Sequence, residues 1–400
     1  MQKQFDVIVA GHLCLDIIPN LKTNRPENLF QPGRLVNIGQ SLLTTGGAVS
    51  NTGIALQRLG IPTRLMGKVG DDNWGDIILD VFRKHDKSLV EGMIVKEGEY
   101  SSYSIVISPE NSDRFFMHYP GTNDTFNVND INKHQLEGAK LFHFGYPPLM
   151  KNMYEKNGEQ LVQIFKNVKE QGLTTSLDLS KPDPNSAAGN VNWKSILTEV
   201  LPFVDIFLPS IEEALYMVNR EKFEQLASFD GEVCKQLNGS LLSELSDELL
   251  GMGTAIVVLK LGDQGLYIKT TSEKTRLENL GNCDLHNIEK WTNRELLIPC
   301  FEVGVSGTTG AGDCTIAGFL SGILKGLTIE ECIKMAVAVG AHNVESIDGT
   351  SGIPKWENVV KRVNSGWKHQ KSELLLDSWK EINGSLFFGP NDSLLEKNFI

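Results

Sequence analysis

Short apolar runs alternate with longer amphipathic segments along most of this 400-residue chain. The short runs predict buried strands, and the longer segments predict helices. Such alternation is typical of a parallel sheet whose strands are joined by crossover helices, so the sequence predicts an α/β fold. The predicted strands are 6–11, 62–69, 140–144, 174–178, 206–208 and 255–261. The predicted helices are 50–59, 74–85, 154–171, 211–218, 311–325 and 329–344.

Two regions, 17–45 and 98–118, interrupt this alternation. In the second region apolar residues such as Tyr103, Ile105 and Met117 roughly alternate with polar residues, a pattern that predicts half-exposed strands. We expect the two regions to form a small separate sheet. The alternative is an edge extension of the main sheet.

Three further stretches differ from the rest in composition. Residues 220–252 predict one or two polar helices, and 271–298, rich in Asn, Glu and Lys, predict an exposed loop. The tail at 367–400 contains apolar residues such as Leu374 and Trp379. We therefore expect this C-terminal extension to pack on the body of the protein or on a partner subunit.

The formal net charge of −12 argues against binding to the backbone of nucleic acids, which requires a basic surface. An anionic cosubstrate must then be attracted locally, by helix ends and a metal ion. The sequence shows neither a signal peptide nor an apolar run long enough to span a membrane. The six cysteines have no paired spacing, and we expect reduced thiols in a cytoplasmic protein. They are Cys14, Cys234, Cys283, Cys300, Cys314 and Cys332.

The motif Gly310-Ala311-Gly312-Asp313 stands directly before a helix-like run. Small residues at a helix N-terminus leave backbone N–H groups accessible, and these groups attract anions. An acid beside a bound phosphate is repulsive unless it has a chemical task, such as accepting the proton of an attacking hydroxyl. The alternative is an aspartate that only begins a helix.

A second glycine-rich stretch lies far upstream, at 46–60. Gly46 and Gly47 allow a ligand to approach the backbone, and the amide of Asn51 can both donate and accept hydrogen bonds. The chain contains neither a Walker A pattern nor the protein-kinase signatures. A phosphate-binding function therefore depends on these two glycine-rich stretches.

Together the two stretches resemble the paired signatures of the ribokinase-like (PfkB) carbohydrate kinases, and the resemblance covers residues 5 to 356. It implies a three-layer α/β/α sandwich with a mostly parallel central sheet, within a kinase domain at 1–366. It also implies that 17–45 and 98–118 form a β-sheet lid over the substrate, which doubles as a homodimer contact. The implied activity is transfer of a phosphoryl group from ATP, with Mg²⁺, to a primary hydroxyl of a small sugar.

The resemblance assigns roles to the motif before the helix. The backbone N–H groups of Gly310, Ala311 and Gly312 form an anion hole for the transferred phosphoryl group, and Asp313 is the general base. We expect the helix dipole to keep the pKa of Asp313 low. Removal of a general base lowers the rate by about 10²–10⁴-fold.

The same resemblance makes Asp16 and Asn51 the anchors of the sugar hydroxyls, with Gly46 and Gly47 as their neighbours. Asp16 lies just past the first predicted strand, where carboxylates are well placed for ligands in doubly wound folds. A solvated loop acid is the alternative. The turn at 119–124 is similar to a family turn near the sugar.

On the nucleotide side, Lys260, Gly262 and Gly265 lie at the end of a predicted strand and its turn. This segment is similar to the one on which the nucleotide phosphates and ribose lie in the family, with the glycines permitting close approach. Gly312 would contact the same phosphates. The helix at 329–344 and the loop at 348–354 would border the adenine and a possible monovalent cation.

Two departures from the family pattern concern cations. Gly307 stands where the family often has an aspartate that helps to hold a monovalent cation, which puts potassium activation in doubt. In the Asn-x-x-Glu pattern that orders Mg²⁺ through water, Glu213 is present while Ser210 replaces the amide. A hydroxyl can still bond to metal-bound water, so we expect Mg²⁺ dependence to persist.

Two alternatives to a sugar kinase stay open. A nucleoside kinase of the same fold would need an aromatic slot for the base, which Tyr119, Tyr146 and Phe116 could supply. The second alternative is a catalytically weak sugar-binding regulator. Only the departures from the family pattern at Gly307 and Ser210 support it. Arg114 is either a contact for an acidic substrate group or a surface residue. The histidines show no spacing typical of a metal site.

Overall fold

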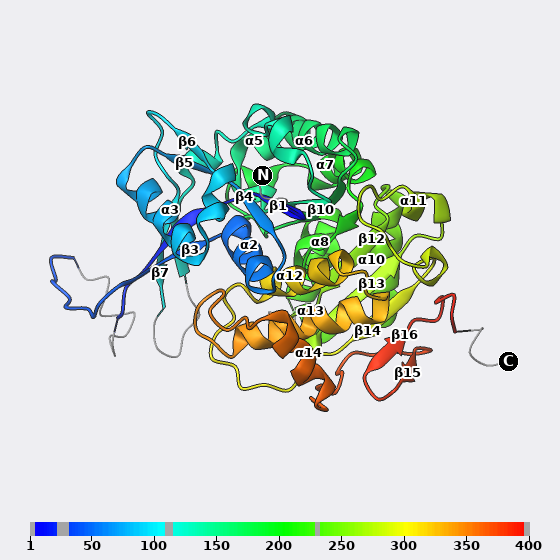
Figure 1. Ribbon diagram of the computed structural model, residues 1–400. Coiled ribbons are helices and arrows are strands. Elements are labelled where there is room, and N and C mark those ends of the chain that lie inside the picture. Colours follow the sequence, from blue (N-terminus) through cyan, green and yellow to red (C-terminus); the bar gives the residue numbers. More distant parts are fainter. Residues whose placement is uncertain (1–4, 22–31, 109–114, 229–232, 396–400) are drawn as a thin grey trace.

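The computed structural model describes the chain except for residues 1–4, 22–31, 109–114, 229–232 and 396–400. Its central element is a ten-stranded sheet in the order β15-β16-β14-β13-β12-β11-β10-β9-β1-β4 (Figure 1). From β4 to β12 all neighbouring strands are parallel, which confirms the predicted parallel core. These strands are β1 (Val7–Gly11), β4 (Thr63–Met66), β9 (Leu141–Gly145), β10 (Thr174–Asp178), β11 (Ile206–Phe207) and β12 (Ile256–Lys260).

The other end of the sheet is antiparallel, and the sequence prediction missed it. Its strands are β13 (Leu266–Thr270), β14 (Glu295–Ile298), β16 (Leu386–Phe388) and β15 (Lys380–Ile382). The prediction of an exposed loop at 271–298 is wrong at its end, since Trp291 and every residue of β14 are buried. β14 has only four residues and follows a polar stretch, so its pattern of apolar residues is too short to be recognised as a strand. The C-terminal extension joins the sheet, because β16 pairs with β14.

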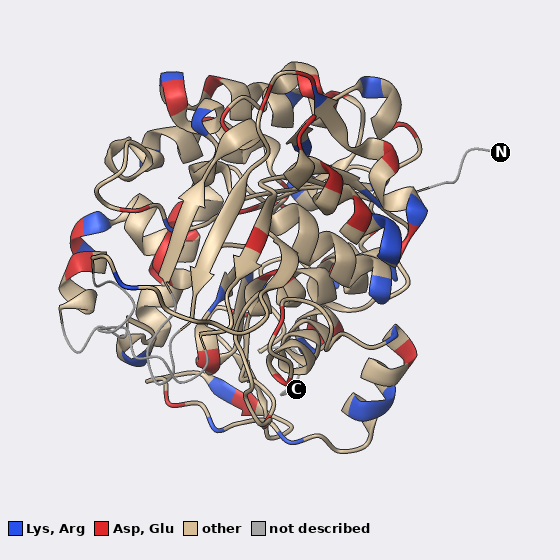
Figure 2. Ribbon diagram, turned by 90° about the vertical axis from the view of Figure 1, so that its left-hand side faces the viewer, with Lys and Arg blue, Asp and Glu red and all other residues tan. Residues whose placement is uncertain are grey.

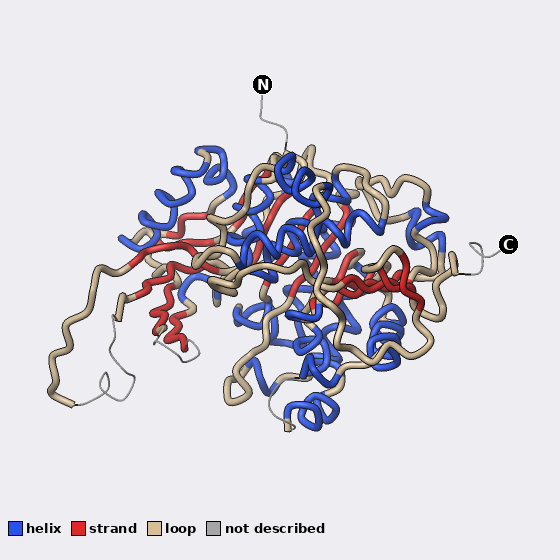
Figure 3. Tube along the Cα trace, turned by 90° about the horizontal axis from the view of Figure 1, so that it is seen from below, coloured by secondary structure: helices blue, strands red, loops and turns tan. Residues whose placement is uncertain are grey.

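Helices cover both faces of this sheet, giving three layers (Figure 3). Side chains alternate between faces along a strand, and in β1 Val7 and Val9 join one apolar core while Ile8 and Ala10 join the other. The first core includes residues of α2 (Ala48–Arg58), α3 (Asn73–His85), α12 (Ala311–Leu324), α13 (Ile329–Val344) and α14 (Trp356–Asn364). The second includes residues of α6 (Glu159–Glu170), α7 (Trp193–Val200), α8 (Ile211–Val218) and α10 (Gly239–Gly251).

Several predicted elements have the observed bounds, namely strand 174–178 and helices 211–218 and 329–344. Ser210 and Thr328 fix the starts of these two helices, because each forms a capping box with a glutamate three residues later. The region 220–252 contains two α-helices, as expected. The remaining α-helices are α4 (Lys133–Leu136), α5 (Lys151–Tyr154), α9 (Arg220–Ala227) and α11 (Lys274–Glu278).

A four-stranded sheet projects from the body on the left of Figure 1, and we call it the lid. Its order is β3-β2-β7-β8, with β2 parallel to β7 and the outer pairs antiparallel. Because it shares no strand with the main sheet, the edge-extension alternative is wrong. Its strands are β2 (Cys14–Ile18), β3 (Leu42–Gly46), β7 (Tyr103–Ile107) and β8 (Phe115–Tyr119). A two-stranded sheet of β5 (Lys68–Gly70) and β6 (Ile94–Lys96) lies apart from both.

Charged residues are interspersed over the molecule. On the face shown in Figure 2, Lys and Arg alternate with Asp and Glu along the outer elements. This mixture, at a net charge of −12, is unlike the continuous basic surface that nucleic-acid backbones require.

Candidate active site

Asp313 lies in the first turn of α12, and its residue is only 2% exposed. Asn51 Nδ2 donates to Asp313 Oδ2 at 3.0 Å, and the Tyr146 hydroxyl lies 2.9 Å from both carboxylate oxygens. Thr52 Oγ1 lies 3.4 Å from Asp313 Oδ1. The two glycine-rich stretches thus meet, because α2 packs against α12 and delivers Asn51 and Thr52 to the carboxylate.

The pKa of Asp313 is raised above the ordinary value for aspartate, mainly because the carboxyl is buried. Hydrogen bonds from Asn51, Tyr146 and Thr52 and the charge of Lys260 oppose this rise without cancelling it. The expectation that the helix dipole keeps this pKa low is therefore wrong. Burial outweighs the helix end at this position, since desolvation penalises the charged form directly.

The turn before α12 exposes some of its amides but not all of them. Gly310 has a left-handed φ of 71°, and a Cβ there would lie 2.8 Å from the Gly349 carbonyl, so only glycine fits. The Ala311 N–H donates to the Thr308 carbonyl at 3.3 Å. In the described part of the chain no backbone carbonyl accepts a hydrogen bond from the N–H groups of Gly310 and Gly312. Two of the three predicted anion-hole amides thus have no backbone acceptor among the described residues, and that of Ala311 is engaged.

A buried charge cluster lies beside this turn. Lys260 Nζ contacts Asp178 Oδ1 at 2.6 Å, and a Cβ on Gly312 would lie 3.6 Å from Lys260 Nζ. Asp178 is fully buried, and its Oδ2 has no partner among the described residues. Burial raises the pKa of Asp178, as do the nearby Glu213 and Asp313, while Lys260 opposes the rise.

Three carboxylates therefore share one ammonium group. Burial alone lowers the pKa of Lys260, but Asp178, Glu213 and Asp313 together raise it above the usual value, so the lysine is charged. The pKa of Glu213 is raised by burial, against the opposing charge of Lys260. The cluster carries an excess of negative charge that suits a cation.

Ser210 and Glu213 bind each other at the start of α8. The Ser210 N–H donates to Glu213 Oε2 at 2.6 Å, and the Glu213 N–H donates to Ser210 Oγ at 3.2 Å. This capping box gives both residues a structural role in addition to the cation role predicted for them. Ser210 also forms an isolated bridge with Lys260, which places the start of α8 beside the charge cluster.

Asp16 lies within strand β2 of the lid, so the reading of this residue as a loop acid is wrong. A Cβ on Gly46 would lie 2.2 Å from Asp16 Oδ2, so only glycine leaves room for the carboxylate. Gly47 has a φ of 87°, and a Cβ there would lie 2.6 Å from the His12 carbonyl. The structure thus brings Asp16, Gly46 and Gly47 together at the start of α2, three residues before Asn51.

Two further predictions about the acceptor side have structural outcomes. Asn123, in the 119–124 turn, forms two hydrogen bonds with the backbone of Leu13. Its Oδ1 accepts from the Leu13 N–H at 3.1 Å, and its Nδ2 donates to the Leu13 carbonyl at 2.8 Å. The predicted aromatic slot is wrong: alternation along β8 places Tyr119 and Phe116 on opposite faces of the lid. The Tyr146 hydroxyl instead holds Asp313. Arg114 lies outside the described residues.

The predicted nucleotide residues meet in one cavity of about 360 Å³. Its wall combines Lys260, Gly262, Gly265 and Gly312 with apolar residues of α13 and with Gln370 from the C-terminal extension. Gly265 is also required by the fold, since a Cβ at this position would lie 2.1 Å from the Ile298 carbonyl. Gln370 was missed because the resemblance ends before it.

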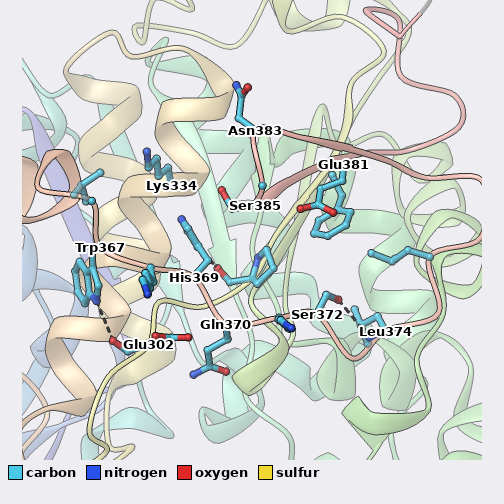
Figure 4. Close-up of a pocket in the computed structure, with 18 residues that line it drawn as sticks. Glu302, Lys334, Trp367, His369, Gln370, Ser372, Leu374, Glu381, Asn383 and Ser385 are labelled. Atoms are coloured by element: carbon cyan, nitrogen blue, oxygen red, sulfur yellow. Dashed lines mark hydrogen bonds between the residues drawn. The ribbon is translucent and has the colours of Figure 1, made fainter.

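The segment that carries Gln370 also lines an outer cavity of about 910 Å³ (Figure 4). Trp367 and His369 both stack on Phe301, with ring centroids 4.4 Å and 3.8 Å away. Trp367 Nε1 donates to the Glu302 carbonyl at 3.0 Å, the dashed line in Figure 4. These contacts fix the extension against the nucleotide cavity.

Sequence reasoning also missed Asp178 and the contact of Tyr146 with Asp313. Tyr146 follows β9 with a left-handed φ of 64°, a conformation that is uncommon for tyrosine and turns the chain at the sheet edge. Asp178 is the last residue of a correctly predicted strand. Its position at the carboxyl end of a parallel strand was the signal that could have identified it.

Comparison with known proteins agrees with this arrangement. The sequence matches the pfkB family of carbohydrate kinases over residues 4–356. An uncharacterized sugar kinase of Archaeoglobus fulgidus is 28% identical over 302 residues, covering 76% of this chain and 99% of that protein. A nucleoside kinase of Methanocaldococcus jannaschii is 24% identical over 368 residues, covering 90% of this chain and 97% of that protein. The structure of Arabidopsis thaliana ribokinase complexed with ribose and ATP has a TM-score of 0.68 at 19% identity, covering 90% of this chain and 99% of that chain.

The fold is therefore that of the ribokinase-like kinases. The protein is a phosphotransferase with an alcohol group as acceptor. The chain belongs to the pfkB carbohydrate kinase family. No helix in the described ranges is both long enough and apolar enough to cross a membrane.

Proposed function

We propose that the protein transfers a phosphoryl group from ATP to a primary hydroxyl of a small sugar or sugar-like molecule. One observation carries this proposal: Asn51 and Tyr146 hold the buried Asp313 carboxylate in the first turn of α12, beside Gly310 and Gly312, whose N–H groups have no backbone acceptor among the described residues. A base and an anion-binding turn at adjacent positions are what hydroxyl phosphorylation requires.

In this proposal Asp313 accepts the proton of the attacking hydroxyl. Its raised pKa makes it a stronger base than an exposed aspartate and fits this task. The N–H groups of Gly310 and Gly312 stabilise the charge on the transferred group, because they are oriented before the substrate arrives. Ala311 contributes through the turn rather than through its own amide.

Asp16, Gly46, Gly47 and Asn51 are proposed to hold the acceptor. Asn51 links the two tasks, since its amide contacts Asp313 while Gly47 is the N-cap of its helix. Closure of the lid over this region would exclude water, which competes as a phosphoryl acceptor. Exposed apolar side chains on the lid, such as Leu42 at 50% and Phe116 at 58%, support the proposal of a homodimer through this sheet.

The charge cluster fits Mg²⁺. Asp178 Oδ2 is a buried oxygen without a partner among the described residues, and hard oxygen ligands are those that Mg²⁺ prefers. Asp178 and Glu213 would hold the ion, directly or through water. When bound, Mg²⁺ would neutralise charge on the nucleotide phosphates. Lys260 stays charged beside it and contributes to the same electrostatic field.

Lys260, Gly262, Gly265 and Gly312 are proposed to border the nucleotide, with Ser210 beside the charge cluster. Potassium activation stays doubtful, since a Cβ on Gly307 would lie only 3.0 Å from the Ser346 and Ile347 carbonyls, which leaves little room for an acid. We also propose a kinase domain at 1–366 with 367–400 as an extension fixed to it. A cytoplasmic location remains a prediction from sequence.

The acceptor is the least determined part of the proposal. A sugar is supported by the family, and a ribonucleoside stays the second candidate because a nucleoside kinase is among the relatives. A sugar-binding regulator is disfavoured, since a binder gains nothing from a buried base aimed beside an anion site.

The direct test measures ADP release with Mg²⁺ against a panel of sugars and ribonucleosides. We expect turnover with at least one acceptor, and a loss of about 10²–10⁴-fold in kcat for Asp313→Asn. Asp80→Asn, an exposed aspartate paired with Arg83, is the matched control and should keep full activity. Equal turnover of Asp313→Asn and wild type, or none with any acceptor, would contradict the proposal.

A further inference from the structure

His12, Cys14 and His118 form a compact cluster between the body and the lid. His12 follows β1, Cys14 begins β2 and His118 lies on β8. One potential metal-ligand atom from each residue lies within 4.8 Å of the other two. His12 and Cys14 are two residues apart, but His118 lies far along the chain, so local spacing could not reveal the third member.

The spacing of the two histidines is that of metal ligands. Their Nε2 atoms are 3.4 Å apart, which is long for an N–H···N hydrogen bond. In a tetrahedral zinc site, with Zn–N bonds of about 2.05 Å, two nitrogens stand about 3.3 Å apart. The distance between the two Nε2 atoms therefore matches that between two ligands of a tetrahedral zinc ion.

The surroundings of His118 orient its ring. Ser104, its register partner on β7, places Oγ 2.9 Å from His118 Nδ1. When the Ser104 hydroxyl donates to Cys14 Sγ and accepts from Nδ1–H, the lone pair of His118 is on Nε2, the arrangement that outer partners give to zinc-bound histidines. Although residue 118 as a whole is exposed, its ring lies against His12, and burial there lowers its pKa.

His12 is only 3% exposed, and its Nδ1 has no partner among the described residues. Burial, followed by the charge of His118, lowers the pKa of His12. Neutral imidazole is the form that binds metals. Because the Nε2 atoms of the two histidines lie 3.4 Å apart, an ion shared by them would bind His12 at Nε2 and leave Nδ1 as it is.

Cys14 supplies a soft ligand. Its thiol is buried, and Sγ lies 3.3 Å from Asp16 Oδ1. Burial and then Asp16 raise the pKa of Cys14, so the free protein carries a thiol rather than a thiolate. A metal must displace this proton, and metal binding is therefore accompanied by proton release.

We propose that His12, Cys14 and His118 bind one divalent cation of the zinc class, with a fourth position open toward Asp16. Two imidazoles and a thiolate select zinc-like ions over the hard Mg²⁺, which prefers oxygen ligands. If the proposed acceptor site is correct, the bound ion occupies its edge and competes with the acceptor. Zinc would then inhibit the kinase.

The test starts with untagged full-length protein stripped by a chelator. Titration with Zn²⁺ or Co²⁺, followed by calorimetry in buffers of different ionisation enthalpy, should show one equivalent bound with release of a proton. Co²⁺ should add a thiolate charge-transfer absorption band. Cys14→Ser should lose this band, and His118→Gln should weaken binding by more than about tenfold.

Cys234→Ser and His134→Gln are the matched controls, since Cys234 lies outside the cluster and His134 is exposed on α4. Both should bind the metal as wild type does. Thermal unfolding without metal shows whether each variant is folded, and His118→Gln, at a residue that is exposed as a whole, keeps the test informative if Cys14→Ser unfolds. Absence of stoichiometric binding, or a band that survives in folded Cys14→Ser, would overturn the proposal.

Activity gives a separate readout. With saturating Mg²⁺, Zn²⁺ should inhibit wild type competitively with the acceptor and inhibit His118→Gln far less. Metal binding without any kinase activity would leave this site in place and reject the proposed function. Kinase activity without metal binding would support the proposed function and reject the metal site.

Discussion

The two sides of the proposed site are built differently. Around Asp313, hydrogen bonds from Asn51 and Tyr146 hold the carboxylate, and all three residues belong to the body. Around Asp16, the side chains belong to the lid, and His12 Nδ1 has no partner in the described part of the chain. The phosphoryl-transfer side is organised before any ligand arrives, whereas the acceptor side is completed by what binds there.

This difference has a physical basis. Oriented dipoles stabilise a transition state only if they need no rearrangement during the reaction, so the residues around Asp313 must be fixed. An acceptor must enter and leave, so its site is closed by an element that can move. Changes on the body side should therefore affect stability and kcat, and changes on the lid side should affect KM.

The largest effect is expected for Lys260→Met, which leaves Asp178 buried without its partner. Breaking a buried ion pair lowers the free energy of unfolding by about 3–5 kcal/mol. The raised pKa of Asp178 in the folded state sets the pH dependence. The penalty should be full above that pKa and vanish below the unfolded-state value, so the variant should recover as the pH falls.

Urea denaturation at several pH values measures this effect. The double variant Lys260→Met with Asp178→Asn is the control, and it should regain part of the stability because the Asp178 carboxylate, which is in direct contact with Lys260, is no longer left buried without its partner. Equal stability of wild type and Lys260→Met at alkaline pH would show that the cluster is hydrated and not a preorganised part of the body.

A smaller effect of a different kind is expected for Asp16→Asn on the lid. Loss of a charged hydrogen-bond acceptor for substrate hydroxyls costs about 1.5–3 kcal/mol, or roughly 10–150-fold in kcat/KM. Most of the change should appear in KM, with the free energy of unfolding nearly unchanged. A fall in kcat at constant KM would contradict the prediction that changes on the lid side act mainly on KM. Steady-state kinetics at varied acceptor concentration separate these outcomes.

The parts of this fold that the sequence predicted are those with local signals. Strand 174–178 begins with two β-branched threonines and ends in an acid, and the helices at 211 and 329 begin with capping boxes. The antiparallel end of the sheet was missed because β14 has only four residues and its partner β16 lies in the C-terminal extension. Pairing between such distant segments leaves no periodic pattern in either of them.

The site shows the same division. Asn51 and Asp313 were recognised from motifs, and the structure places them in contact. Tyr146 joins them only because β9 and β10 are neighbours and end together, with Gly145 opposite Asp178. The pKa of Asp313 was predicted in the wrong direction because a local motif shows the helix end but not the burial.

The most direct test of Asp313 as a buried base is the pH dependence of kcat/KM in wild type and in Tyr146→Phe. Asp313 must be ionised to accept a proton, so activity should fall as the pH drops through its raised pKa, above the ordinary value of about 3.9. The Tyr146 hydroxyl lowers that pKa, so its removal should move the acidic limb to higher pH by about one unit. An acidic limb at the same pH in both proteins would contradict the assignment of Asp313 as the base.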